Sequence, residues 1–357
     1  MRIKKIQAEK IRLTLTEPIT VAFGTVEYLE NVVIKMDTDE GIAGYGEAAP
    51  MPFVNGETAD SVLAALRLFE AAIAGDNPLE IADVHKKMEA ALYHNGAAKC
   101  AVDLALHDIW GKAMSLPVFR LLGGAEPTVQ NDVTIGIGPM SWVLEKARHY
   151  AEAMGYRVLK IKAGVDPAHD IEVIKEIRRT LGAGVRLRVD ANQGYDLKSA
   201  VAAVEAFGAL GVEAVEQCLP WWDFEGNAEL KRHAGAVKIM LDESIHDVHD
   251  ASRACAENAA DILNIKLMKC GGLYPAMKIA DIAQAQGLSC MVGCMIESPI
   301  AITAGLSLVA AHPAATDADC DSYMYYTNTT GVEGSYTIEG DEVKLPELPG
   351  LGVKMPF

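Results

Sequence analysis

The chain has 357 residues, of which half are apolar and 23% are charged, an ordinary balance for a globular protein with a buried core. Its formal net charge of −17 opposes binding to a nucleic-acid backbone or to an anionic membrane surface. The length fits a barrel domain of typical size together with a smaller domain. We therefore expect a small molecule as partner, and neither nucleic acid nor membrane.

The seven cysteines are odd in number and form no Cys-x-x-Cys pair, which argues against a disulfide framework and against a thiolate zinc site. Residues 1–15 lack the apolar segment of a signal peptide. No apolar run reaches the roughly 18 residues that a membrane span requires. We expect a cytoplasmic protein with reduced thiols that forms a homo-oligomer.

The first third of the chain predicts an α+β domain. Apolar and polar residues alternate over residues 3–45, which predicts antiparallel strands. Over residues 58–114 the apolar positions recur every three or four residues, which predicts helices. We place this domain at residues 1–124, with its end at Gly123 and Gly124.

Eight short apolar or β-branched segments follow at steps of 24 to 29 residues, namely 133–137, 158–161, 187–189, 214–215, 239–241, 262–267, 290–292 and 318–320. Each step has room for a strand, a helix and two loops. The regular spacing favours a (β/α)₈ barrel over a doubly wound open sheet, which periodicity alone leaves open. We expect the barrel at residues 125–326, and we expect the Gly- and Pro-rich tail, 327–357, to return to the first domain.

Three acidic residues stand at the ends of consecutive predicted strands: Asp190, Glu216 and Asp242, each 26 residues from the next. Because the carboxyl ends of barrel strands all face one mouth, these side chains should converge there. Oxygen ligands on rigid strands suit Mg²⁺. Each acid taken alone is more typical of a helix N-cap, but the equal spacing of all three favours a magnesium site.

Lysines occur on the strands that flank the predicted metal site. Lys160 and Lys162 share one face of the second strand, and Lys266 lies on the sixth. A buried ammonium is costly unless it is paired or functional, and a barrel strand is buried on both sides. A Lys-x-Lys pair alone is usually a solvated face. In this setting we expect Lys162 and Lys266 on opposite sides of the mouth, with the metal strands between them.

This arrangement predicts proton transfer at a carbon next to a carboxylate. Such a proton is a very weak acid, and Mg²⁺ would neutralise the charge of the enediolate that forms when it leaves. A lysine close to Lys160 and Mg²⁺ would have its charged form disfavoured and would act as a base. Lys162 and Lys266 could then remove a proton from one face and return one to the other, which gives an epimer.

Together, the motifs Lys160-x-Lys162, Asp190-Ala-Asn192, Glu216-Gln217, Asp242-Glu243 and Lys266 with the following 268–272 segment resemble the enolase superfamily, muconate lactonizing enzyme subgroup. The superfamily's use of a Lys or His base with Mg²⁺ belongs to this resemblance and not to the spacing. The resemblance covers nearly the whole chain. It implies an α/β protein: a modified TIM barrel, (β/α)₇β, with an N-terminal α+β capping domain completed by the C-terminal tail.

Within this subgroup, dipeptide epimerases such as L-Ala-D/L-Glu epimerases carry an Asp-x-Asp motif after the eighth strand, which Asp319-Cys320-Asp321 matches. The resemblance implies that this pair holds the α-ammonium of a dipeptide, and an acidic pair on one strand face suits a cation. Muconate cycloisomerases and o-succinylbenzoate synthases bind substrates without an ammonium. These two activities, N-acylamino acid racemase activity and a non-catalytic ligand-binding barrel are the alternatives to a Mg²⁺-dependent dipeptide epimerase.

The side chain of the substrate is predicted from two loops. Relatives that act on Ala-Glu dipeptides tend to carry an arginine where this chain has Gly24, in the segment 22–25. The loop Met51-Pro52-Phe53-Val54 is apolar. We therefore expect a dipeptide with an apolar side chain.

Several further residues are expected to support the site. Asn192 and Glu243 should orient the metal ligands and Lys266. The expected substrate contacts, besides the Asp-x-Asp pair, are Thr134, Lys160, Cys294 and Ile296. His246 and His249 are expected to be solvated rather than metal ligands. The segment 136–138 lacks the third glycine of a dinucleotide-binding motif.

Overall fold

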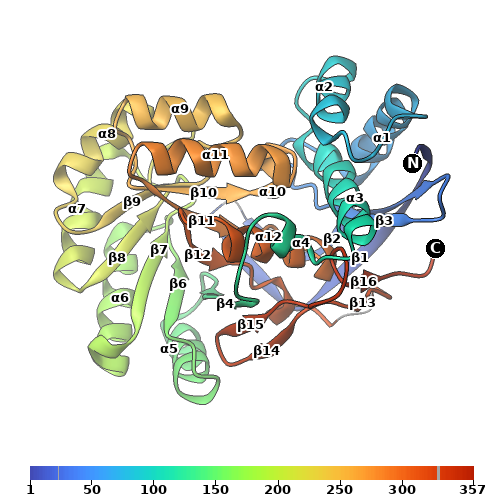
Figure 1. Ribbon diagram of the computed structural model, residues 1–357. Coiled ribbons are helices and arrows are strands. Elements are labelled where there is room, and N and C mark those ends of the chain that lie inside the picture. Colours follow the sequence, from blue (N-terminus) through green and yellow to red (C-terminus); the bar gives the residue numbers. More distant parts are fainter. Residues whose placement is uncertain (23, 328–329) are drawn as a thin grey trace.

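The computed structural model describes residues 1–22, 24–327 and 330–357. It consists of a barrel and a smaller α+β body that lies beside the barrel, and the C-terminal segment runs back to this smaller body (Figure 1). The smaller body begins with an antiparallel sheet in the order β1 (Ile3–Val21), β2 (Gly24–Thr38), β3 (Ala43–Ala48). These strands match the predicted alternation.

Four helices follow this sheet: α1 (Ala59–Ile73), α2 (Ile81–Ala91), α3 (Gly96–Met114) and α4 (Val118–Leu121). The alanine-rich α3 is buried along most of its length, which explains why it has no polar face. Its backbone packs directly on β3. A Cβ atom added to Gly46 would lie only 1.9 Å from the carbonyl oxygen of Ala101. Small residues on both elements therefore allow this close contact.

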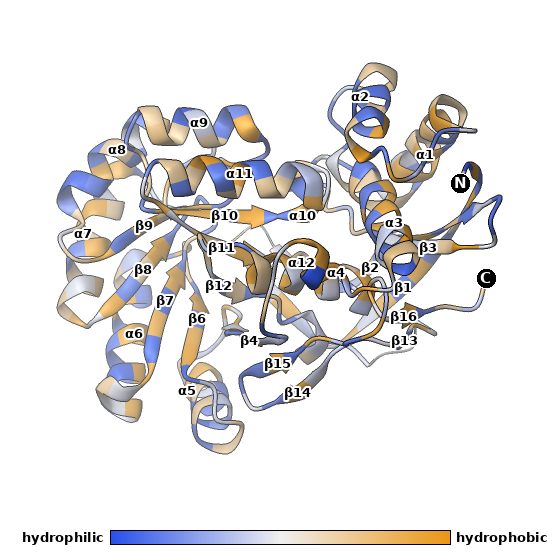
Figure 2. Ribbon diagram, viewed as in Figure 1, coloured by the Kyte–Doolittle hydropathy of each residue, from blue (hydrophilic) through white to orange (hydrophobic). Residues whose placement is uncertain are grey.

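The barrel has eight parallel strands in the spatial order β12 to β5: β5 (Val133–Ile135), β6 (Val158–Lys162), β7 (Arg186–Asp190), β8 (Val212–Glu216), β9 (Lys238–Leu241), β10 (Ile262–Lys266), β11 (Ser289–Gly293) and β12 (Ala315–Asp319). Each predicted segment overlaps one of these strands. The eighth begins three residues earlier than expected, because the polar sequence Ala-Thr-Asp gave no apolar signal. Figure 2 shows that the barrel strands are largely hydrophobic.

Helices cover the outside of the barrel: α5 (Met140–Arg148), α6 (Pro167–Leu181), α7 (Leu197–Ala209), α8 (Phe224–His233), α9 (Val248–Ala256), α11 (Leu273–Ala285) and α12 (Pro299–Ala311). The single-turn helix α10 (Leu267–Cys270) follows β10 directly and packs against α3. In the described part of the chain, β12 is followed by the 3₁₀ turn Ser322–Met324 and short strands instead of an eighth outer helix. The (β/α)₈ barrel expected from spacing is therefore wrong in this detail. The (β/α)₇β barrel implied by the resemblance is confirmed.

The barrel closes between its last and first strands through individual hydrogen bonds. The amide of Asp132 donates to the carbonyl oxygen of Ala318 over 3.1 Å. The amide of Cys320 donates to the side-chain oxygen of Asn131 over 2.9 Å. Side chains near this seam are consequently held close to one another, which matters for the site described below.

The tail forms short strands: β13 (Glu333–Gly334) pairs with β16 (Val353–Lys354), and β14 (Thr337–Glu339) and β15 (Glu342–Lys344) extend from β4 (Thr128–Gln130). The amide of Leu351 donates to the carboxylate of Asp108 on α3 over 2.8 Å. Since the tail contacts both bodies, we propose residues 1–124 as a capping domain, 125–326 as the barrel domain and 327–357 as a segment that completes the capping domain.

Buried carboxylates of the capping domain cap two helices of the barrel. Glu47 on β3 accepts hydrogen bonds from the amide and hydroxyl of Ser298, over 2.8 and 2.6 Å, at the start of α12. Asp103 on α3 accepts from the amide of Leu273, over 2.6 Å, at the start of α11. A negative charge at a helix N-terminus is favourable, so these contacts fix the cap on the barrel.

No described helix is long and apolar enough to cross a membrane.

Candidate active site

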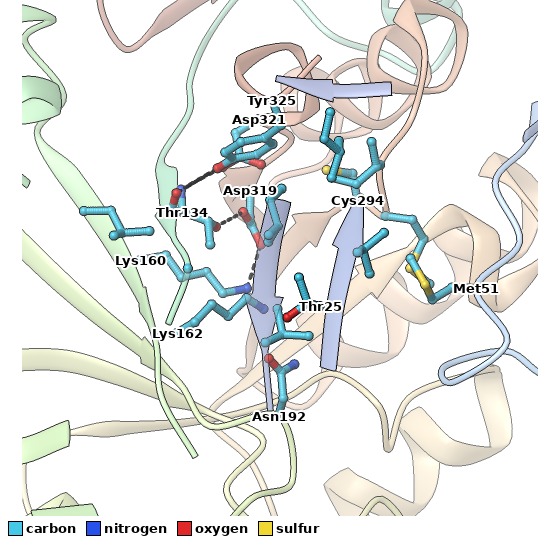
Figure 3. Close-up of a pocket in the computed structure, with 18 of the residues that line it drawn as sticks. Thr25, Met51, Thr134, Lys160, Lys162, Asn192, Cys294, Asp319, Asp321 and Tyr325 are labelled. Atoms are coloured by element: carbon cyan, nitrogen blue, oxygen red, sulfur yellow. Dashed lines mark hydrogen bonds and ion pairs between the residues drawn. The ribbon is translucent and has the colours of Figure 1, made fainter. Parts of the chain in front are cut away.

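A cavity of about 270 Å³ lies between the capping domain and the barrel mouth. Its wall includes most of the predicted site residues, namely Thr134, Lys160, Lys162, Asn192, Asp242, Glu243, Lys266, Cys294, Ile296, Asp319 and Asp321. Figure 3 shows Thr134, Lys160 and Lys162 on one side of the cavity, with Cys294 and Met51 on the other. Asp190 and Glu216 do not line the cavity; they lie behind Lys160, which contacts both.

The three predicted metal ligands lie at the ends of neighbouring strands. Asp190 ends β7 and pairs in register with Glu216, the last residue of β8. Asp242 directly follows β9. All three carboxylates are almost completely buried, with at most 2% of each residue exposed. Their positions follow from the barrel, because the carboxyl ends of its parallel strands all lie at the same mouth.

Four lysine ammonium groups neutralise these carboxylates. The Nζ atom of Lys160 lies 2.8 Å from Glu216 and 3.1 Å from Asp190. Lys162 lies 2.6 Å from Asp190. On the other side of the mouth, Lys266 and Lys269 lie 2.7 and 2.5 Å from the two oxygens of Asp242. Lys162 and Lys266 thus flank the acidic strands, as the sequence predicts.

Lys269 makes a buried ion pair with Asp242 that the sequence analysis did not assign. It lies on the single-turn helix α10, three residues after Lys266, and only 5% of the residue is exposed. The sequence signal that could have indicated Lys269 is a second lysine, one helical turn after Lys266, in an otherwise apolar segment. Its role is visible only once α10 places it against Asp242.

Burial and neighbouring charges together set the pKa values of the titratable groups. Burial, reinforced by Asp190, raises the pKa of Glu216 to about 7. Burial disfavours the charge on Lys160, but Asp319, Glu216 and Asp190 outweigh it and raise the lysine's pKa well above its usual range. The pKa of Lys266 is also raised, because Asp242 outweighs burial.

The donor set fits a hard divalent cation. Asp190, Glu216 and Asp242 offer only oxygen atoms, which Mg²⁺ prefers. Two buried oxygens beside them, Oδ1 of Asn192 and Oε2 of Glu243, have no hydrogen-bond partner among the described residues. The side-chain amide of Asn192 donates to the other oxygen of Glu243 over 3.1 Å, and its backbone amide donates to Asp190 over 2.9 Å. The surroundings therefore carry unused oxygen acceptors, a favourable setting for a cation or its water ligands.

The Asp-x-Asp motif lies at the seam of the barrel. Asp319 accepts from Lys160 over 2.7 Å and from the hydroxyl of Thr134 over 3.3 Å. Asp321 accepts from the amide of Thr134 over 2.7 Å and from the hydroxyl of Tyr325. Burial and the nearby charge of Asp319 raise the pKa of Asp321 to about 6. The sequence analysis did not single out Tyr325, which follows Asp321 by four residues and reaches the site through the turn after β12.

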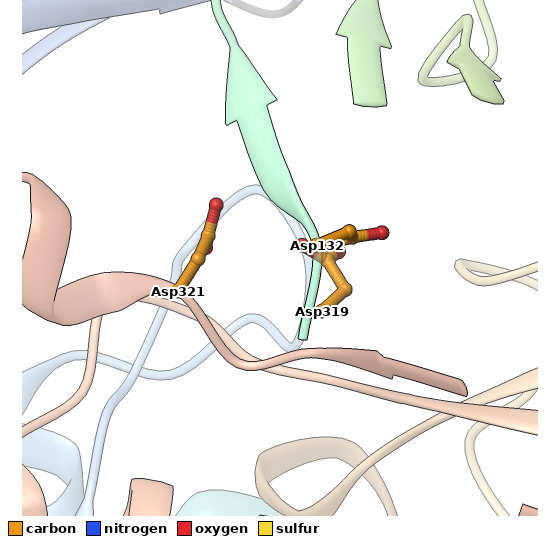
Figure 4. Close-up of side chains that lie close together, drawn as sticks. All are labelled: Asp132, Asp319 and Asp321. Carbon is orange, nitrogen blue, oxygen red and sulfur yellow. The ribbon is translucent and has the colours of Figure 1, made fainter. Parts of the chain in front are cut away.

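A second unassigned residue, Asp132, joins this pair. Single oxygens of Asp132, Asp319 and Asp321 lie within 4.8 Å of one another (Figure 4). Asp132 accepts from Arg188 over 3.1 Å with one oxygen, while its other oxygen has no hydrogen-bond partner in the described part of the chain. The predicted metal ligands form no such compact group, and lysine ammonium groups lie against each of them. We favour the predicted ligands for the metal nonetheless, since they lie at the ends of three neighbouring strands between Lys162 and Lys266, whereas Asp319 and Asp321 are held by Thr134 at the barrel seam.

The remaining predicted contacts are distributed around the rim. The sulfur of Cys294 lies 3.2 Å from the hydroxyl oxygen of Ser322. Gly24 and Val54 line the cavity, while Phe23 of the predicted specificity loop lies outside the described residues. His249 is exposed, as expected. The expectation of a solvated His246 is wrong: it is half-buried, with Nε2 3.3 Å from the carbonyl oxygen of Val54.

Comparison with known proteins agrees with this geometry. Residues 5–123 match the mandelate racemase / muconate lactonizing enzyme N-terminal domain, and residues 142–356 match the enolase C-terminal domain-like family. The chain therefore belongs to the enolase superfamily, in its mandelate racemase and muconate lactonizing enzyme branch.

Individual relatives cover almost the entire chain. It is 38% identical to the hydrophobic dipeptide epimerase of Enterococcus faecalis V583 over 355 residues, 99% of each chain. The crystal structure of the dipeptide epimerase from that organism with Mg and the dipeptide L-Leu-L-Tyr superposes with a TM-score of 0.96, at 37% identity, covering 99% of this chain and all of the other. The substrate-liganded L-Ala-D/L-Glu epimerase of Bacillus subtilis has the same TM-score at 35% identity, with 99% of each chain covered.

Proposed function

We propose that this chain is a Mg²⁺-dependent dipeptide epimerase, an isomerase that inverts the α-carbon next to the substrate carboxylate. The supporting observation is one cavity that has Lys162 and Lys266 on opposite sides, buried carboxylates between them and the acidic pair Asp319 and Asp321 along the wall. Proton donors on two faces of one carbon are what a 1,1-proton transfer needs. The relatives named as dipeptide epimerases support the same activity.

In this proposal each part of the site has a separate task. Asp190, Glu216 and Asp242 hold Mg²⁺, which when bound neutralises charge on the substrate carboxylate. One of Lys162 and Lys266 removes the α-proton and the other delivers a proton to the opposite face of the enediolate. Asn192 and Glu243 orient these groups. Asp319 and Asp321 bind the α-ammonium, and Lys160 keeps Asp319 ionised and in place.

We further propose that the substrate side chains are apolar. The capping-domain side of the cavity carries Leu15, Ile19, Val26, Met51 and Val54, and Ile296 faces them from the barrel. Gly24, where Ala-Glu-specific relatives carry an arginine, supplies no charge for an acidic side chain. The relative named for hydrophobic dipeptides, and its complex with L-Leu-L-Tyr, support this preference. Thr134 and Cys294 complete the proposed substrate contacts.

Deuterium exchange tests the proposal. A library of dipeptides incubated with the enzyme and Mg²⁺ in D₂O should gain one α-deuterium at the C-terminal residue, detected by mass spectrometry, with the apolar members exchanging fastest. Lys162→Ala and Lys266→Ala should each abolish epimerisation. Absence of exchange across the library would refute the activity. Sedimentation velocity tests the predicted homo-oligomer separately.

A paired variant separates the proposed activity from those of related enzymes. Asp319→Asn combined with Asp321→Asn should cripple turnover of dipeptides, whose ammonium loses its acidic partners. The same change should matter little for N-succinyl amino acids, muconate or other substrates without an ammonium. If the double variant retained full dipeptide turnover, the assignment of the ammonium site would be wrong.

A further inference from the structure

An ion pair between the two domains forms part of the cavity wall. Glu17, near the end of β1 in the capping domain, pairs with Lys146 on helix α5 of the barrel. Both residues line the cavity, and 41% and 26% of their side chains are exposed. The ammonium of Lys146 also lies 5.5 Å from the centre of the Trp142 ring, which lines the cavity as well. None of the roles proposed above uses this pair.

The backbone around Glu17 is attached to the barrel at two points. The amide of Thr16 donates to the carbonyl oxygen of Tyr325 over 2.8 Å, and the amide of Ile137 donates to the carbonyl oxygen of Thr20 over 2.9 Å. Tyr325 is the residue whose hydroxyl contacts Asp321. Glu17 is therefore held next to the ammonium end of the cavity and is not part of a free loop.

The Glu17–Lys146 pair lies near the position expected for the N-terminal residue of a bound dipeptide. A dipeptide with its ammonium at Asp319 and Asp321 has its N-terminal residue beside β5, since Thr134 is bonded to both carboxylates. Its C-terminal α-carbon lies further in, between Lys162 and Lys266. Helix α5 directly follows β5, and Tyr150, which lines the cavity just beyond that helix, lies close enough to both carboxylates that burial together with the charges of Asp321 and Glu17 raises its pKa to about 12. The N-terminal side chain is thus the part of the dipeptide nearest the pair.

We propose that the Glu17–Lys146 ion pair selects the N-terminal residue of the substrate, an inference that rests on the proposed dipeptide epimerase function. While the two charges neutralise each other, the subsite has no net charge to offer and admits uncharged side chains. A charged substrate side chain would lose hydrating water there, and its attraction to one residue of the pair would be offset by its repulsion from the other. Removal of one partner leaves a single uncompensated charge that attracts the opposite side chain.

Reciprocal variants test this role. In the full chain with Mg²⁺, kcat/KM is measured for L-Lys-L-Leu and L-Glu-L-Leu. Lys146→Met, which leaves Glu17 alone, should raise the ratio of the first to the second by about tenfold, and Glu17→Gln should lower it by about the same factor. The double variant should return to within about threefold of the original ratio, because neither charge remains. Lys175→Met, which breaks the Glu172–Lys175 pair on the outer helix α6, is the matched control and should not change it.

A second series locates the effect. L-Leu-L-Lys and L-Leu-L-Glu carry the charge on the C-terminal residue, and their ratio should stay constant in all variants. An unchanged ratio in the N-terminal series, or an equal change in both series, would overturn the proposal. Thermal unfolding verifies that each variant is folded, and calorimetric affinities for the same dipeptides give the same ratios independently of turnover. If the chain binds these dipeptides selectively but exchanges no α-proton, the proposed function fails while the role of the pair stands.

Discussion

Tyr325→Phe is the sharpest test of how the ammonium site is held. The Tyr325 hydroxyl donates to Asp321 and accepts from the amide of Thr134 over 3.1 Å. A hydrogen bond to a charged group contributes about 1.5–3 kcal/mol, so its loss is equivalent to roughly a tenfold to hundredfold change in an equilibrium constant. The amide of Thr134 still holds Asp321, which places the expected effect at the lower end of this range.

The expected result is a rise in KM of about tenfold with a smaller change in kcat, because the hydroxyl acts on ammonium binding and not on either lysine. Initial rates of α-deuterium incorporation over a range of dipeptide concentrations give both constants. Tyr323→Phe is the matched control: its hydroxyl lies in the same turn, accepts from Asn131 over 3.0 Å and does not line the cavity. If Tyr325→Phe lowered kcat alone, or if both variants behaved alike, Tyr325 would not position Asp321.

Three further outcomes follow from the same contacts. Since the pKa of Asp321 is about 6 and only the carboxylate binds an ammonium, KM for dipeptides should rise as pH falls through 6, as initial rates across pH 5 to 8 would reveal. Asp103→Asn removes a buried charge that caps α11 and pairs with His85 and His107, and should lower the free energy of unfolding in urea by about 3 kcal/mol. Burial lowers the pKa of His107, but Asp103 outweighs burial and raises it above its ordinary 6.5. The stabilisation from the Asp103–His107 pair is therefore complete below about pH 6.5 and declines as pH rises through the raised pKa, so a loss of unfolding free energy in Asp103→Asn that grew with pH would contradict this. Removal of Mg²⁺ with a chelator should abolish exchange, and Mg²⁺ should restore it and raise the unfolding temperature.

The strands and the acidic and basic side chains at their ends could be predicted because a barrel repeats. Asp190, Glu216 and Asp242 recur at one strand per step, and a period of two places Lys160 and Lys162 on one face. The missing eighth outer helix could not be predicted from spacing, because the tail that replaces it has no repeat to compare with. It was the resemblance to a family that supplied this feature.

Tyr325, Asp132 and Lys269 were missed for a common physical reason. Each reaches the site from a segment without periodicity: the turn after β12, the residue before β5 and the one-turn helix after β10. Their contacts depend on how the barrel seam closes and on where a single helical turn points. Such contacts are long-range in sequence, as between Tyr325 and Thr134, and no local pattern encodes them.

The division of labour between the two domains explains why chemistry was easier to infer than substrate. In the proposed mechanism, the groups that transfer protons, hold the metal and bind the ammonium all lie on or directly after barrel strands, whose geometry the fold fixes. Much of the apolar wall comes from the capping domain, including Met51 and Val54 in the loop after β3, where no strand register determines the side chain. The Glu17–Lys146 pair joins these two parts at the rim. Substitutions in the cap can therefore change which dipeptide enters while the lysines keep their positions, and this separation makes the substrate the least predictable property of such a sequence.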